Sequence, residues 1–335
     1  MAIINVKYLG LNLKSPIVVS ACSLSDKVEN IRIMEAAGAG AVVLFSLFEE
    51  QIHQEAELYS SLEDQDAKTK SESEDYFPST NEYHIGTEKY LDHIREAKAA
   101  VDIPIIASLS GVTPEGWIEY GKQIEKAGAD AIEINVFYIP ADPLTTSIEV
   151  ENKYVDIVKA LKKNVRIPVA MKLNPYFSAT ANMARQLKDA GADGLVLFNR
   201  FYEPDFDIEK MEVISTLEYS STHEIRLPLL WISALHDRID VSLAASSGVQ
   251  TVDQVIKYIL AGSNVVMTAS TLYQNGLGYI NTLNDDLKAW MTRHKFESVD
   301  QMRGLMSQSK IADPTAFGRA NYIKVIGIER KLSPF

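Results

Sequence analysis

The amino-acid sequence predicts a (β/α)8 barrel, in which eight parallel strands close into a cylinder that helices surround. Two observations lead to this fold class. A short Ala-Gly pattern recurs four times and joins the end of an amphipathic stretch to an apolar run. Four further apolar runs lie between the copies, so strand and helix candidates alternate along the 335 residues. We expect residues 1–335 to form a single barrel domain.

The four Ala-Gly copies predict junctions between a helix and the following strand. They read "AGAGAVVLF" from Ala37, "AGADAIEIN" from Ala127, "AGADGLVLF" from Ala190 and "AGSNVVMTA" from Ala261. A helix is commonly closed by a glycine in the left-handed conformation, and a strand buried on both faces is a continuous apolar run. These junctions supply the second, fourth, sixth and eighth strands.

The remaining strands are the apolar runs between the junctions. They are "PIVVSA" from Pro16, "IPIIASL" from Ile103, "IPVAMKL" from Ile167 and "DVSLAAS" from Asp240. An open doubly wound sheet is the alternative architecture. It is less favoured, because no G-x-G-x-x-G turn follows the first strand.

Three segments lie outside the repeat. Residues 4–14 predict a hairpin that turns at Leu9 and Gly10 and could plug the N-terminal mouth of the barrel. Residues 48–85 form a long acidic insertion after strand two, which is either a functional lid or a solvated excursion. Residues 296–335 form a C-terminal extension whose "SVDQMRGLMSQ" is typical of a helix, and we expect it to pack on the barrel or on a second subunit.

Composition excludes several function classes. The formal charge of −12 argues against a nucleic-acid partner, because phosphate binding needs a basic surface. Between Glu49 and Asp75 ten acidic residues oppose two lysines, a local charge of −8. The single cysteine, Cys22, excludes an internal disulfide and a cysteine-ligated cluster, and the six histidines lack ligand spacing, so we expect no metal. No apolar run is long enough to span a membrane, so we expect a cytoplasmic protein.

Two turns near the end of the chain are suited to a phosphate group. Ser247 and Gly248 form a tight turn before a helix that Thr251 could cap, and Ala269 and Ser270 lead straight from a strand into a helix. Small side chains leave backbone N–H groups open to an anion, and helix dipoles favour it. The alternative is that both turns are only connectors.

Polar side chains also end three adjacent strands. Lys172 closes the fifth strand, and Asn135 and Asn199 end the strands on either side of it. Activity in such barrels lies at the C-terminal ends of the strands. Lys172 could stabilise an anionic cofactor or intermediate, form a Schiff base, or simply reach solvent.

These motifs together resemble the dihydroorotate dehydrogenase family, which are FMN enzymes built on a (β/α)8 barrel. The matching pieces, in order, are "YLGLNLKSPIVVSA", "ADAIEINVFYIP", "IPVAMKLNPYF" and "GVQTVDQVIKYILAGSNVVMTASTLYQNG". The resemblance implies that Ser20 and Ala21 lie against the flavin ring and that Lys172 faces its N1/O2 edge. It implies that Asn135 and Asn199 bind the flavin or substrate, and that the phosphate lies on Ser247, Gly248, Ala269 and Ser270.

The part of the family pattern that binds dihydroorotate differs in this chain. Tyr138 stands where the family has a Cys or Ser that accepts a proton from the substrate, and we expect it to act as a neutral hydrogen-bond donor. Phe45 stands where the family has a Lys. Thr145, Thr146 and Ser147 offer other hydroxyls, or else they cap the following helix.

The resemblance implies an FMN-dependent oxidoreductase that passes a hydride between a substrate carbon and flavin N5. The substrate is dihydroorotate or a related small molecule, which would place the enzyme in pyrimidine biosynthesis, and the soluble class of the family is commonly dimeric. One alternative is an aldolase-type enzyme that uses Lys172 as a Schiff base. The other is a non-catalytic FMN-binding electron-transfer subunit, with the acidic segment 49–75 as a docking surface for its partner.

Overall fold

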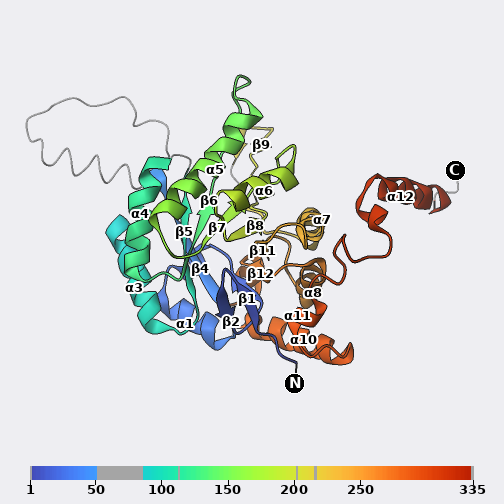
Figure 1. Cartoon of the computed structure of the whole chain (residues 1–335), viewed down its shortest axis with the longest axis horizontal. Coiled ribbons are helices and arrows are strands. Elements are labelled where there is room, and N and C mark those ends of the chain that lie inside the picture. The colour runs from blue at the N-terminus through green and yellow to red at the C-terminus, as the bar shows by residue number, and fades with distance from the viewer. Residues whose placement is uncertain (1, 51–85, 112–113, 201–202, 215–216, 333–335) are drawn as a thin grey trace, which may run out of the picture.

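The structure is a computed structural model that describes residues 2–50, 86–111, 114–200, 203–214 and 217–332. Within them, eight parallel strands pair in the closed order β11-β12-β3-β4-β5-β6-β7-β8, so the predicted barrel is confirmed (Figure 1). The strands are β3 (Ile17–Val19), β4 (Ala41–Phe48), β5 (Ile105–Ser110), β6 (Ala131–Asn135), β7 (Val169–Leu173), β8 (Gly194–Leu197), β11 (Ser242–Ala245) and β12 (Val265–Thr268). Each lies within a run that the sequence indicated or overlaps it.

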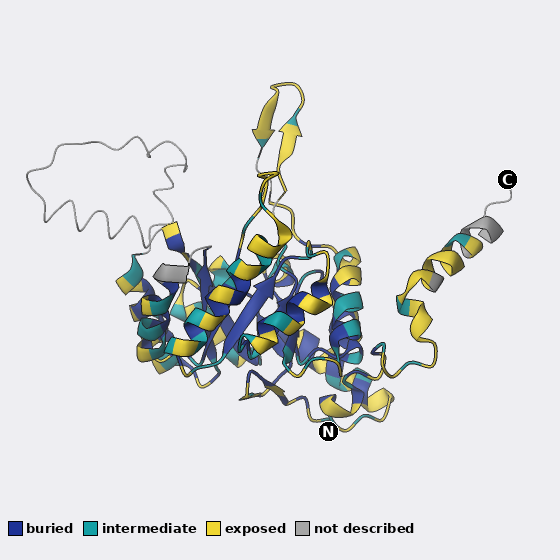
Figure 2. Ribbon diagram, turned by 45° about the horizontal axis from the view of Figure 1, so that its top comes forward, coloured by how far each residue is buried: buried dark blue, intermediate teal, exposed yellow. Residues whose placement is uncertain are grey.

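Helices surround the barrel and bury one apolar face against it (Figure 2). They are α1 (Val28–Ala36), α3 (Thr87–Ala100), α4 (Pro114–Ala127), α5 (Ser147–Asn164), α6 (Thr180–Asp189), α7 (Arg226–Leu235), α8 (Val252–Ala261), α9 (Ser270–Asn275) and α10 (Tyr279–Arg293). Thr146 caps α5, because its Oγ1 accepts the Glu149 N–H at 3.3 Å while Glu149 Oε2 accepts the Thr146 N–H at 2.7 Å. Of the two roles considered for this hydroxyl, the structure shows the capping role.

The four Ala-Gly junctions have the expected geometry. Gly38, Gly128, Gly191 and Gly262 all adopt positive φ angles between 91° and 124°. In two of the junctions an aspartate follows the glycine and binds the start of the neighbouring strand. Asp130 Oδ2 accepts the Ile105 N–H at 2.7 Å, and Asp193 Oδ2 accepts the Val169 N–H at 2.8 Å. The repeated motif therefore ends a helix and also sets the register at the N-terminal rim of the barrel.

The N-terminal hairpin is also as predicted. Strands β1 (Val6–Tyr8) and β2 (Leu11–Leu13) pair antiparallel around Leu9 and Gly10, both with positive φ. The Leu9 N–H donates to Ser242 Oγ at 3.0 Å, and the Asn264 amide donates to the Lys7 carbonyl at 3.0 Å. Because Ser242 and Asn264 lie where β11 and β12 begin, the hairpin covers the N-terminal mouth.

The C-terminal extension differs from the expected single helix. Only α11 (Val299–Met302) is helical in the predicted segment, because Gly304 turns the chain with a φ of +74°. The Gly304 and Met306 N–H groups then donate to the carbonyls of Ile259 and Leu260, so this part packs on the barrel as expected. A second helix, α12 (Arg319–Leu332), was not predicted and stands apart from the barrel in Figure 1.

A two-stranded ribbon that was not predicted projects from the C-terminal face. Its strands are β9 (Asp205–Asp207) and β10 (Glu212–Ile214), and Figure 2 shows it almost wholly exposed. Most of the predicted insertion at 48–85 lies outside the described residues. No helix among those that are described combines the length and apolar character that crossing a bilayer requires.

Candidate active site

A pocket of about 920 Å³ opens at the C-terminal ends of the barrel strands. All nine residues predicted to hold a cofactor line it: Ser20, Ala21, Asn135, Lys172, Asn199, Ser247, Gly248, Ala269 and Ser270. Tyr138 is not among the residues that line it, whereas its neighbour Phe137 is. The Tyr138 ring instead has Lys153 Nζ 5.3 Å from its centroid.

Three adjacent strands bring an ammonium group and two amides together in this pocket. Asn135 and Lys172 are register partners on β6 and β7. Asn199 follows β8, where its backbone N–H donates to the Leu173 carbonyl at 2.7 Å. Its side-chain amide donates to Asn135 Oδ1 at 2.8 Å, so the two asparagines hold each other in place.

A buried carboxylate lies beside the ammonium group. Glu133 is two residues before Asn135 on β6, so both side chains point to the same side of the strand. Its Oε1 lies 3.6 Å from Lys172 Nζ, and their side chains are only 1% and 8% exposed. Burial raises the pKa of the Glu133 carboxyl, and the Lys172 charge opposes that rise.

At the other end of the pocket, the turn before α8 has the conformation expected of a small-residue loop. Ser247 and Gly248 adopt φ angles of 79° and 72°. A Cβ on Gly248 would lie 2.8 Å from the Ser221 carbonyl oxygen and 2.7 Å from Ile225 Cγ2. The position therefore requires glycine. Thr251 is the N-cap residue of α8, as predicted, and its N–H donates to Gln254 Oε1 at 2.8 Å.

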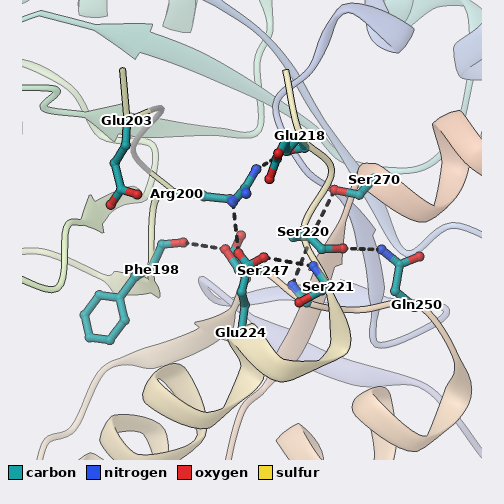
Figure 3. A network of polar contacts seen from close by, with 12 residues as sticks. Phe198, Arg200, Glu203, Glu218, Ser220, Ser221, Glu224, Ser247, Gln250 and Ser270 are labelled. Carbon is teal, nitrogen blue, oxygen red and sulfur yellow. Dashed lines mark hydrogen bonds and ion pairs between the residues drawn. The ribbon is translucent and has the colours of Figure 1, made fainter. Parts of the chain in front are cut away.

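Ser220 connects the two turns that the sequence assigned to a phosphate (Figure 3). Its Oγ accepts the Gly248 N–H at 3.2 Å and lies 3.0 Å from Ser270 Oγ. Its carbonyl accepts a hydrogen bond from the Gln250 amide at 2.6 Å. Both turns thus direct hydrogen-bonding groups at one small region, as a shared phosphate group requires.

An ion pair holds the segment that carries Ser220. Arg200 Nε lies 2.9 Å from Glu224 Oε2, and the Arg200 guanidinium also donates to the Glu218 carbonyl. Glu224 Oε1 in turn accepts the Ser221 N–H at 2.9 Å. Figure 3 shows these residues converging from the end of β8 and from the segment before α7.

Aromatic side chains line the rest of the pocket. They are Phe45, Phe48, Phe137, Tyr219 and Tyr273. The rings of Tyr219 and Tyr273 stack with centroids 5.6 Å apart, and the Tyr273 hydroxyl lies 2.7 Å from Ser23 Oγ. Burial raises the pKa of Tyr273 to about 12, so its hydroxyl is neutral at pH 7 and can donate a hydrogen bond.

The arrangement fits a flavin nucleotide. One end of the pocket offers small residues and hydrogen-bonding groups at two turns, which suits a phosphate. The other end offers amides and a buried ammonium group, which suit a flat heterocycle that gains negative charge when it is reduced. Within the described residues, no group of three or more metal-binding side chains occurs.

Sequence reasoning missed Glu133 and Ser220 for different reasons. Glu133 could have been found, because the period of two in a strand places it on the same side as Asn135. Ser220 lies 23 positions beyond the end of β8, in a segment without apolar periodicity, and nothing local in the sequence indicates that it returns to the turn at Gly248.

Comparisons with known proteins point to one family. The family model described as dihydroorotate dehydrogenase matches residues 79–291. A protein of Methanocaldococcus jannaschii named dihydroorotate dehydrogenase B (NAD(+)), catalytic subunit, is 27% identical over 215 residues, which cover 62% of this chain and 69% of that protein. Proteins of the same name from Thermoplasma volcanium and Staphylococcus carnosus are 24% and 23% identical, and each match covers 91% of this chain and at least 98% of the relative.

Proposed function

The chain belongs to the dihydroorotate dehydrogenase family, and from this premise we propose that it binds FMN and passes a hydride from a substrate carbon to flavin N5. It is a flavin-dependent oxidoreductase that acts on a CH–CH bond. The observation that carries the proposal is the meeting of Lys172, Asn135 and Asn199 at one end of a pocket whose other end is formed by the turns at Gly248 and Ser270.

The phosphate of FMN is assigned to the two turns. Ser247, Ala269 and Ser270 supply backbone N–H groups and a hydroxyl. Gly248 shapes the first turn, and its N–H holds the Ser220 hydroxyl, which also lies 3.0 Å from Ser270 Oγ. Hydrogen bonds to a charged oxygen are roughly twice as strong as neutral ones, so this cradle can hold a phosphate without a lysine or arginine.

The flavin ring is assigned to the opposite end. Ser20 and Ala21 contact the ring, the amides of Asn135 and Asn199 bind its polar edge or the substrate, and Lys172 faces the N1/O2 edge. FMN supplies the hydride acceptor when it is bound. Lys172 supplies a buried positive charge where the ring gains negative charge, which stabilises the reduced form more than the oxidised form.

The substrate region is less like that of a typical family member. Phe45 and Phe137 provide apolar surface, and the neutral Tyr273 hydroxyl provides a hydrogen-bond donor. The role of Tyr138 as a neutral hydrogen-bond donor stays a prediction. Tyr138 is not among the residues that line the pocket. We assign dihydroorotate or a related small molecule as the substrate, which would place the reaction in pyrimidine biosynthesis.

The experiment is an anaerobic reduction of the purified protein. We expect bound FMN to give a yellow protein, and dihydroorotate to bleach its long-wavelength absorption. The test variant is Lys172→Met, which should lower the rate by at least about tenfold, since a charged donor is worth about 1.5–3 kcal/mol. FMN that stays oxidised with dihydroorotate would remove this substrate, and a protein that does not bind FMN would refute the function.

The two alternatives are not supported. A Schiff-base lysine must be free to attack a carbonyl carbon, whereas Lys172 Nζ is paired with the buried Glu133 carboxylate at 3.6 Å. No observation favours a subunit that only transfers electrons.

Partners are inferred from the relatives and from the surface. Because the relatives are named catalytic subunits, we infer that this chain also passes electrons to a partner subunit. We further propose a homodimer, since the ribbon β9–β10 exposes Phe206 and Val213 by 65% and 67%. A cytoplasmic location stays a prediction.

A further inference from the structure

The ion pair between Glu133 and Lys172 has an unusual environment. Neither carboxylate oxygen of Glu133 accepts a hydrogen bond from any described residue, although both are buried. The Lys172 ammonium at 3.6 Å is therefore the group that compensates the carboxylate. A buried carboxylate that lacks both hydrogen bonds and a counter-charge is costly, and it takes up a proton instead.

The other groups around Glu133 do not supply a second positive charge. Its register partner on β5 is Ser108, whose hydroxyl is held by Ser46 Oγ at 2.8 Å. The titratable groups that interact with Glu133 are Lys172 from β7, Tyr8 from the N-terminal hairpin and Tyr90 from α3. Burial raises the pKa of both tyrosines, so they are neutral near pH 7.

Lys172 thus lies between a carboxylate and the pocket assigned to the flavin. On one side lies the Glu133 carboxylate, and on the other lies the pocket that Lys172 lines. When the pocket holds an oxidised, uncharged flavin ring, the ammonium compensates Glu133. When the ring gains an electron pair, one ammonium faces two anions in a water-poor interior, where like charges repel strongly.

We propose, on the basis of the function proposed above, that Glu133 takes up one proton when the bound flavin is reduced, which leaves the Lys172 charge to neutralise the reduced ring. In this step a hydride adds two electrons and one proton to the flavin, which becomes an anion. One further proton moves from solvent to the Glu133 carboxylate, which becomes a neutral carboxylic acid. The flavin and Glu133 together then carry one negative charge before and after reduction.

The proposal predicts how the midpoint potential of the bound flavin depends on pH. For a two-electron couple, each proton taken up shifts the potential by about 29.6 mV per pH unit. We expect about 59 mV per pH unit for the wild-type holoprotein near neutral pH, and about half that slope for Glu133→Gln, which cannot bind the second proton. The control is Glu119→Gln, the same change at an exposed helical position, which should keep the wild-type slope.

The potentials are measured by equilibrating the FMN-loaded protein with reference dyes over about two pH units around neutrality. Equal slopes for the wild type and Glu133→Gln would overturn the proposal. If Glu133→Gln does not fold, the reduced-minus-oxidised infrared spectrum of the wild type decides, since it must gain the carbonyl band of a protonated carboxyl. Absence of that band contradicts the inference alone, whereas a protein that holds no FMN refutes the proposed function before any slope is measured.

Discussion

Gly248 shows how a single residue shapes the phosphate end of the pocket. Its φ of 72° and its approach to the Ser221 carbonyl leave no room for a side chain. Its N–H also donates to Ser220 Oγ. Glycine at position 248 therefore keeps both this turn and the Ser220 hydroxyl in place.

Gly248→Ala is expected to weaken FMN binding. The added methyl group must displace residues 221–225 and with them Ser220, so at least one hydrogen bond to a charged oxygen is lost. Such a bond is worth about 1.5–3 kcal/mol, which corresponds to roughly 10- to 100-fold in the dissociation constant. Quenching of FMN fluorescence on titration with apoprotein measures the constant.

Gly278→Ala is the matched control for this substitution. Gly278 has a φ of −63°, and a Cβ there would meet nothing within 4 Å. It should bind FMN as the wild type does. If Gly248→Ala also binds FMN with unchanged affinity, the turn is only a connector and the phosphate lies elsewhere.

Sequence reasoning at the residue scale succeeded where position in a strand determines position in the fold. Asn135, Lys172 and Asn199 were found because residues at the C-terminal ends of barrel strands share one face. Arg200, Glu224 and Ser220 were not found, because their meeting depends on the path of the long segment between β8 and α7, which no local pattern specifies.

At the scale of the elements, the helix-to-strand junctions were the most predictable feature. A glycine that ends a helix and an apolar run that follows it are both local signals, and all four glycines have the expected positive φ. The ribbon β9–β10 was missed because it is exposed and short, so it lacks a buried face that would impose alternation. The segment after Met302 was mistaken for helix because Val299, Met302 and Met306 have helical spacing, whereas Gly304 turns the chain.

The C-terminal extension is joined to the barrel through His236, which packs against Gly262 at the end of α8 and against Gly304. Burial lowers the pKa of His236, with smaller effects from Arg303 and Lys310, while Asp237 opposes the shift. The folded protein therefore prefers the neutral ring, and the extension should be most firmly held when His236 is uncharged.

This preference predicts a pH dependence of stability. The pKa of His236 in the folded state lies below the ordinary value of 6.5. The stabilisation of the folded protein by the neutral ring is therefore complete above pH 6.5 and is lost as the pH falls below it. We expect Tm to fall more for the wild type than for His236→Gln between about pH 7 and pH 5, by about 1–3 °C. If Tm falls equally with pH for the two proteins, protonation of His236 does not affect the stability of the fold.

At the scale of the whole molecule, the exposed ribbon β9–β10 is the surface to which we assign the proposed homodimer. Phe206 and Val213 are directly opposite each other on its two strands, so they form one apolar patch. The double substitution Phe206→Asp with Val213→Asp should convert a dimer into a monomer while FMN stays bound. Sedimentation equilibrium measures the mass, and Ile33→Asp on the exposed face of α1 serves as the control. A wild-type protein that sediments as a monomer would contradict the proposed dimer.

The charge of the molecule follows from its composition, and the role of the acidic segment stays a prediction. The −8 between Glu49 and Asp75 is most of the formal −12, and residues 51–85 of this segment lie outside the described residues. What the whole fold does establish is that one pocket, built from all eight strand ends, collects the nine predicted cofactor residues.

The identity of the flavin released from the purified protein tests the central claim most directly. Acid denaturation of the native protein, followed by chromatography of the supernatant, should release FMN in a ratio approaching one molecule per chain. A protein that releases no flavin, and whose apo form does not take up added FMN, would contradict the account of this pocket.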